Sequence, residues 1–161
     1  ASYIDAIFDD FKNGPCDRTF VPPASDDCPI VNGGPARVKD FTGRTPSGVP
    51  ELAITVSGTY TFDLTENMTG YVRGEYIYED AYQATDAVPV EVPNALRKVG
   101  TLNASLGVKD SASGFSIMLW GRNINDDEYI YTGFNVPGSP GSYAGYPVVP
   151  KMWGLTLSRD F

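Results

Sequence analysis

The sequence predicts an all-β fold and, within that class, an antiparallel transmembrane β-barrel segment of about six strands. Three observations predict it: apolar and polar residues alternate in several segments, short and long connections follow one another strictly, and the chain of 161 residues ends in an aromatic residue, Phe161. Alternation with a period of two puts apolar side chains on one face of a strand and polar ones on the other. Membrane barrels carry aromatic girdles at both bilayer interfaces, where a closing strand ends.

Six segments carry this alternation. The first and weakest is Ser2–Phe11, in which one face carries Ile4, Ala6 and Phe8. The other face carries Tyr3, Asp5, Ile7 and Asp9. The five others are Glu51–Asp63, Met68–Tyr78, Thr101–Lys109, Phe115–Arg122 and the run from Trp153 to Phe161. Most of them approach roughly 9–11 residues, the length that a tilted strand needs to cross a bilayer.

The most regular pattern lies in residues 51–63. Its even-numbered positions carry apolar, aromatic or glycine residues, and its odd-numbered positions carry polar residues or alanine. In residues 115–122 the polar row is interrupted by Met118 and Trp120. A soluble antiparallel sheet with one wet face shows the same alternation, so the pattern alone does not identify a membrane strand.

The connections favour the membrane interpretation. Residues 65–67 join the second and third segments, and residues 110–114 join the fourth and fifth; both connections are short and rich in turn residues. The other three, residues 12–49, 81–96 and 132–149, are long. Short and long connections therefore alternate, and every long one falls at the same end of the sheet. Transmembrane barrels segregate short periplasmic turns from long outer loops in this way.

Composition and motifs argue against other classes. No run approaches the eighteen or so apolar residues of a membrane-spanning helix. The net charge of −8 is unfavourable for nucleic-acid binding, and the sequence has no histidine to act as a general base. It also lacks a nucleophile elbow, a P-loop and a dinucleotide-binding glycine motif. We therefore expect no enzyme, no cofactor and no nucleic-acid partner.

Acidic residues gather in the connections, including Glu79-Asp80 and Asp126-Asp127-Glu128. A carboxylate pair for glycoside hydrolysis and a calcium site are alternatives for these clusters. The preferred interpretation is a solvated acidic rim, because no calcium loop with fixed ligand spacing and its glycine is present. We expect no metal site.

The two cysteines of the chain, Cys16 and Cys28, lie in the first long connection. Their separation excludes a C-x-x-C redox or zinc pair. In an oxidising compartment they would form a disulfide across an exposed loop, which stabilises a loop of this size by roughly 3 kcal/mol. Two free thiols are the alternative and would require a cytosolic protein.

Residues 122–129, Arg-Asn-Ile-Asn-Asp-Asp-Glu-Tyr, are similar to the R-N-L-x-D-x-x-Y box near the end of TonB-dependent outer-membrane receptors. The defining positions of the box are Arg122, Asn123, Asp126 and Tyr129. In that family a G-x-P-R element and a closing strand ending in phenylalanine follow. Gly145-Tyr146-Pro147 and Pro150-Lys151 stand where that element belongs, and residues 154–161 resemble the closing strand.

Upstream, residues 41–44 and 49–51 resemble the family's lead into a strand, so the likeness covers most of residues 40–161. Two positions depart from the pattern: Ile124 replaces leucine and Lys151 replaces arginine. The resemblance implies a barrel of 22 strands with an N-terminal plug domain. About six strands without a plug imply that residues 1–161 are the C-terminal portion of the barrel of a longer receptor.

The resemblance implies active uptake, in which outer loops capture a scarce nutrient: an iron-siderophore, cobalamin or an oligosaccharide. Its partners would be outer-membrane lipid, the plug and remaining strands of its own receptor, the TonB complex acting through the plug, and the nutrient. The location would be the outer membrane of a Gram-negative bacterium, with the long loops extracellular. The competing class is a secreted, soluble β-sandwich that binds carbohydrate; it requires a second sheet over the apolar face.

Two sets of residues are candidates for function. The aromatic residues of the long connections are suited to stacking on a ligand, although packing at the membrane interface is an alternative. They are Tyr82, Tyr131, Phe134, Tyr143 and Tyr146. The resemblance implies that the last strand is an assembly signal for the insertion machinery. Its residues are Gly154, Leu155, Leu157 and Phe161.

Overall fold

The computed structural model describes residues 1–15, 38–86, 88, 92, 94–139 and 141–160. These residues form a six-stranded antiparallel sheet and two two-stranded sheets, with no helix among them. The large sheet consists of β1 (Ser2–Tyr3), β4 (Leu52–Asp63), β5 (Met68–Gln83), β6 (Leu96–Asp110), β7 (Phe115–Arg122) and β10 (Met152–Arg159). The small sheets pair β2 (Gly14–Pro15) with β3 (Val38–Lys39) and β8 (Ile130–Asn135) with β9 (Tyr143–Pro147). The all-β, antiparallel prediction is confirmed.

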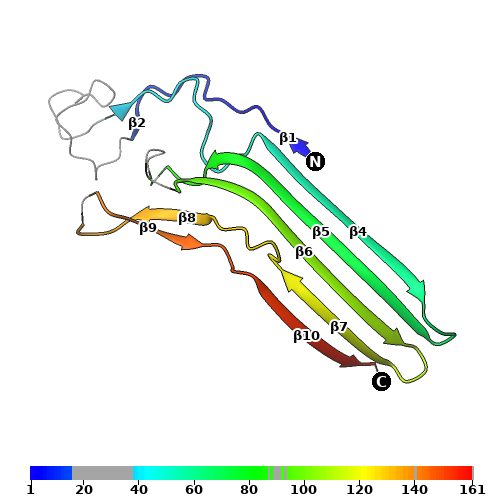
Figure 1. The fold of residues 1–161 in the computed structure, drawn as a ribbon. Helices are drawn as coiled ribbons and strands as arrows, with labels where there is room; N and C mark the ends of the chain where they lie inside the picture. The colour runs from blue at the N-terminus through cyan, green and yellow to red at the C-terminus, as the bar shows by residue number, and fades with distance from the viewer. Residues whose placement is uncertain (16–37, 87, 89–91, 93, 140, 161) are drawn as a thin grey trace.

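The large sheet is a meander, in which chain neighbours pair in the order β1-β4-β5-β6-β7-β10. The turns β4–β5 and β6–β7 lie together at one end, and the three longer connections lie at the other (Figure 1). The predicted segregation of short and long connections is therefore correct. The sheet is open, because β1 and β10 are edges that do not pair with each other.

Several strands differ from the prediction. β5 continues to Gln83 and β6 begins at Leu96, so the connection between them is shorter than residues 81–96. The hairpin β8–β9 begins at Ile130 and occupies most of the long connection 132–149, and the sequence pattern did not predict it. Backbone hydrogen bonds between neighbouring strands continue past the alternating segments, because pairing does not require that one face be apolar.

The first predicted strand, residues 2–11, is wrong beyond Tyr3. The Phe8 and Phe11 rings lie 5.0 Å apart, and Phe11 packs against Phe41 at 5.5 Å. The Phe8 amide donates to the Arg44 carbonyl, and its own carbonyl accepts from the Gly43 amide. Phe8 and Phe11 thus form an aromatic cluster with Phe41, and hydrogen bonds to the 41–44 turn satisfy backbone groups of Phe8 without extending the sheet.

Register defines the two faces of the sheet. The apolar face carries even-numbered residues of β4, β6 and the first part of β5, and odd-numbered residues of β7 and β10. One directly paired row across it consists of Tyr60, Val72, Leu106, Leu119 and Leu155. The opposite, polar face carries a row made of Asp63, Thr69, Lys109, Ser116 and Ser158. The predicted alternation is therefore continuous from strand to strand.

Nothing in the described residues covers the apolar face. Leu157 is 72% exposed, Val56 62% and Trp153 59%. In the described part of the chain the only buried hydrophobic residues are Val88 and Val99, both near the long-connection end. A folded soluble domain buries its apolar layer against a second layer, and the described residues do not provide one. None of them forms a helix long and apolar enough to span a membrane.

Candidate functional site at the long-connection end

The segment that follows β7 is organised by Asn123, which is 4% exposed. Its side-chain Nδ2 donates to the carbonyls of Asp127 (2.9 Å) and Val149 (3.1 Å), and its Oδ1 accepts from the Asp127 amide (2.8 Å). Asn123 has a φ of +49°, a left-handed conformation that asparagine tolerates better than most residues. Its side chain therefore closes a tight corner and ties that corner to the approach to β10.

Beyond the corner, side chains replace the backbone ladder along β6. Asn125 accepts from the Leu102 amide (2.9 Å) and donates to the Gly100 carbonyl (2.7 Å). Asp127 accepts from the Gly100 amide at 2.7 Å. β7 pairs with β6 only over residues 104–109 of β6, so these contacts cover edge groups that would otherwise be left open.

The remaining positions of the R-N-L-x-D-x-x-Y-like box also have structural partners. Asp126, at φ +56°, accepts from the Lys151 ammonium at 3.3 Å. The Arg122 guanidinium lies 5.5 Å from the Trp120 ring on the polar face. The box is thus a corner that ends β7 and aligns the start of β10, and the Asp126 and Asp127 carboxylates already accept hydrogen bonds there.

An arginine that the sequence pattern did not single out lies at the centre of the aromatic residues. The Arg97 guanidinium lies 5.6 Å from the Tyr82 ring, 5.3 Å from the Tyr129 ring and 4.8 Å from the Tyr131 ring. It pairs with Glu79 at 3.1 Å, and the Tyr82 hydroxyl donates to the same carboxylate at 2.9 Å. We call these five residues the Arg97 cluster.

A β-bulge explains how Tyr82 reaches this cluster. The β5–β6 register shifts between Glu79 and Tyr82, so that Tyr82 pairs with Arg97. Without the inserted residue, an even-numbered tyrosine would lie on the apolar face with Tyr76 and Tyr78. The bulge instead turns Tyr82 to the polar face, where Glu79 also lies. No single-strand pattern signals this change of face.

The other predicted ligand-facing residues lie on the β8–β9 hairpin. The Phe134 and Tyr146 rings are 5.6 Å apart and exposed, and they form an aromatic pair separate from the Arg97 cluster. Tyr143 pairs with Asn135 across the hairpin. Val88 lies against Gly133, so the hairpin also touches the connection between β5 and β6. Of the predicted residues, Tyr82 and Tyr131 thus belong to the Arg97 cluster, Phe134 and Tyr146 form a ring pair, and Tyr143 lies opposite Asn135 in the hairpin.

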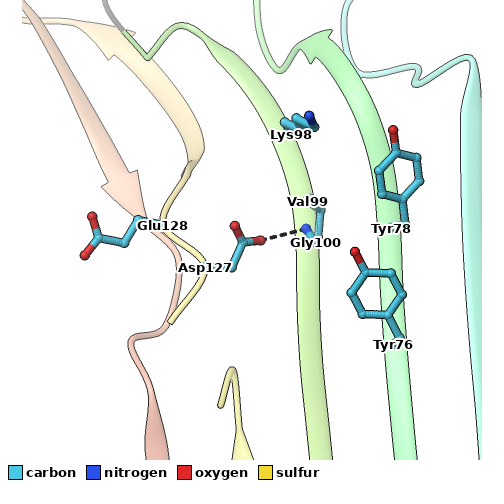
Figure 2. A pocket seen from close by; sticks show the side chains of 7 residues that line it. All are labelled: Tyr76, Tyr78, Lys98, Val99, Gly100, Asp127 and Glu128. Carbon is cyan, nitrogen blue, oxygen red and sulfur yellow. Dashed lines mark hydrogen bonds between the residues drawn. The ribbon is translucent and has the colours of Figure 1, made fainter. Parts of the chain in front are cut away.

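A shallow hollow of about 430 Å³ opens beside β5 and β6 at the same end of the sheet. Tyr76, Tyr78, Lys98 and Gly100 line it, and the Asp127 carboxylate closes one side by its bond to the Gly100 amide (Figure 2). The Tyr76 hydroxyl lies 3.3 Å from where a Cβ at residue 100 would be, so the glycine keeps the hollow open. Figure 2 shows the Glu128 carboxylate pointing away from Gly100.

The last strand places its predicted residues on opposite faces. Leu155 and Leu157 extend from the apolar face, whereas Gly154 lies under the Trp120 ring on the polar face. The Arg159 guanidinium lies 4.8 Å from the Phe115 ring at the short-turn end. Phe161 lies outside the described residues, as do Cys16 and Cys28, so the predicted terminal anchor and disulfide stay predictions.

Just after β10, the Asp160 carboxylate accepts from the Lys109 ammonium at 2.8 Å. This hydrogen bond and the lysine charge hold the pKa of Asp160 below its usual range.

Among the described residues, no group of three or more histidine, cysteine, aspartate or glutamate side chains could hold a metal ion. No family model, curated protein or solved structure matches the chain.

Proposed function

We propose that the chain is a section of the wall of a TonB-dependent outer-membrane receptor, which takes up a scarce nutrient by active transport. The observation that carries the proposal is the exposed apolar face, formed by a single sheet whose opposite face is polar. Water would disfavour such a face by about 25 cal/mol for each Å² of apolar surface. A bilayer removes this cost, because lipid tails are as apolar as the side chains.

The positions of charged residues support a membrane-sized apolar band. Along β6, charged residues on the apolar face stand only near its ends, at Lys98 and Asp110. At about 3.4 Å per residue, these positions are about 40 Å apart along the strand. With a tilt of about 35–45°, their separation along the membrane normal is about 28–33 Å, slightly more than the apolar band of about 25 Å in such barrels.

The open edges support a larger barrel. A closed barrel has no free edges, whereas β10 and most of β4 have unpaired outer edges among the described strands. Unpaired backbone groups are not tolerated in lipid. In our proposal, further strands of a 22-stranded barrel pair with both edges, and a plug fills the lumen next to the polar face. The long connections then lie outside the cell.

The nutrient would be bound at this outer end. The exposed Phe134–Tyr146 pair and the open side of Tyr131, which is 57% exposed, offer ring faces for stacking on an iron chelate, a cobalamin or an oligosaccharide. We assign the chain no catalytic role. The TonB complex would act through the plug and not through these residues.

The test is to measure which face contacts lipid. Spin labels are attached at Val56 and at Ser57, on adjacent positions of β4, in the full-length receptor with Cys16 and Cys28 replaced by serine. The label at Val56 should be quenched by oxygen dissolved in lipid and the label at Ser57 by a water-soluble nickel complex. Equal accessibility at the two positions would refute the barrel wall.

The same experiment separates the membrane wall from the soluble β-sandwich. A sandwich would bury the Val56 label against a second sheet, so neither quencher would reach it, and the protein would stay soluble without detergent. The transport proposal is tested by uptake of a ferric chelate, cobalamin and a maltooligosaccharide. Uptake of at least one should require the receptor and be lost in cells that lack TonB.

A further inference from the structure

The hollow beside β5 and β6 has the chemistry of a site for a phosphate group. Lys98 is exposed and lies on the apolar face, at the end of β6 near the long connections. In the described part of the chain no carboxylate forms an ion pair with it, whereas Lys12, Lys109 and Lys151 each have one. On this face of β6 the only other charged residue is Asp110, near the opposite end of the strand, so the Lys98 ammonium is available to an anionic ligand.

The neighbouring groups complete the site. The Tyr76 and Tyr78 side chains lie on the same face along β5 and project toward the hollow (Figure 2). Their hydroxyls are donors of the kind that accompany lysine at phosphate oxygens. The missing side chain at Gly100 leaves room between the strands. Two carboxylates also line the hollow: Asp127 accepts a hydrogen bond from the Gly100 amide and Glu128 points away from Gly100 (Figure 2), which limits their repulsion of an anion.

The position also fits a lipid. Below the hollow, the apolar face continues without a charged residue through Val72, Leu106 and Leu119. A molecule whose phosphate lies at Lys98 could therefore place its acyl chains along this surface. Tyrosine and lysine side chains are common where the hydrocarbon meets the headgroups, because each has an apolar stem and a polar tip.

We propose that Lys98, Tyr76 and Tyr78 form a site for the phosphate of an anionic lipid in the outer leaflet. This inference rests on the proposed function, since it requires that the apolar face meet lipid. The lysine supplies the charge, the tyrosine hydroxyls supply directed hydrogen bonds, and the apolar face below holds the chains.

The test compares lipid binding by the full-length receptor in mild detergent. Dioleoyl phosphatidylglycerol and dioleoyl phosphatidylcholine have the same chains and differ in net charge, and native mass spectrometry counts the bound molecules. Lys98→Gln should weaken phosphatidylglycerol binding about fivefold, the effect of one basic residue near a lipid surface. Lys98→Arg should restore it. Lys109→Gln removes a lysine on the polar face and should leave binding unchanged.

The outcomes separate the lipid site from the barrel. If the receptor inserts into vesicles and Lys98→Gln binds phosphatidylglycerol as tightly as the unaltered protein, the lipid site is wrong and the barrel stands. If inorganic phosphate competes as well as the lipid, the site binds free phosphate and the lipid assignment is wrong. If the protein does not enter vesicles at all, both proposals fail.

Discussion

Replacing Asn123 tests whether the corner after β7 stabilises the junction between β7 and β10. Asn123→Ala removes three hydrogen bonds, to the Asp127 carbonyl, the Val149 carbonyl and the Asp127 amide. The loss of each hydrogen bond lowers the free energy of unfolding by about 1 kcal/mol, because a buried partner is left unsatisfied. Alanine at a φ of +49° adds about 1 kcal/mol of backbone strain. We expect the free energy of unfolding to fall by about 4 kcal/mol in total.

The measurement is urea unfolding of the protein in lipid vesicles, followed by tryptophan fluorescence. Asn123→Gly avoids the backbone strain and should lower the free energy of unfolding by about 3 kcal/mol, which separates the two contributions. Asn125→Ala is the matched control, because its two hydrogen bonds are exposed and water can replace them; its cost should be about 1 kcal/mol or less. Equal costs for Asn123→Ala and Asn125→Ala would show that burial of the corner does not matter and would refute the reasoning.

Three further predictions follow from the same structure. Arg97→Ala should loosen the β8–β9 hairpin, because its cation–π contacts with Tyr131 on β8 and with Tyr129 just before it, about 0.5–1 kcal/mol each, are lost. Amide exchange in the hairpin should accelerate about tenfold, and Arg97→Lys should be intermediate; unchanged exchange would show that Arg97 does not hold the hairpin. Cys16 and Cys28 should resist a membrane-impermeant thiol reagent on intact cells until reductant is added; labelling without reductant would disprove the disulfide. Deleting Phe161 should lower the amount of inserted receptor and leave ligand affinity per inserted molecule unchanged; normal insertion with weakened binding would reverse the proposed orientation.

The sequence by itself determined the five long strands of the large sheet and the two faces they present, but not the short β1. Alternation between apolar and polar residues is a local property with a period of two, so Leu155 and Leu157 share one face whatever the strand pairs with. The sequence also predicted which connections lie at which end of the sheet. Short turns make neighbouring strands antiparallel, so connections alternate between the two ends. The residues of the R-N-L-x-D-x-x-Y-like box were found in sequence, but their hydrogen bonds were not.

Only the tertiary structure decided which segments pair and where the polar groups meet. The apolar residues of 2–11 alternate, yet Phe8 packs on Phe11 and Phe11 on Phe41, because a distant turn supplies both the third ring and the hydrogen bonds. In the sequence, nothing distinguishes Arg97 from other charged residues near strand ends. Its contact with Tyr82 depends on the β5 bulge, which places both residues on the polar face. Register and bulges depend on hydrogen bonds between residues far apart in the chain. The sequence of a single strand therefore does not specify its pairing partner.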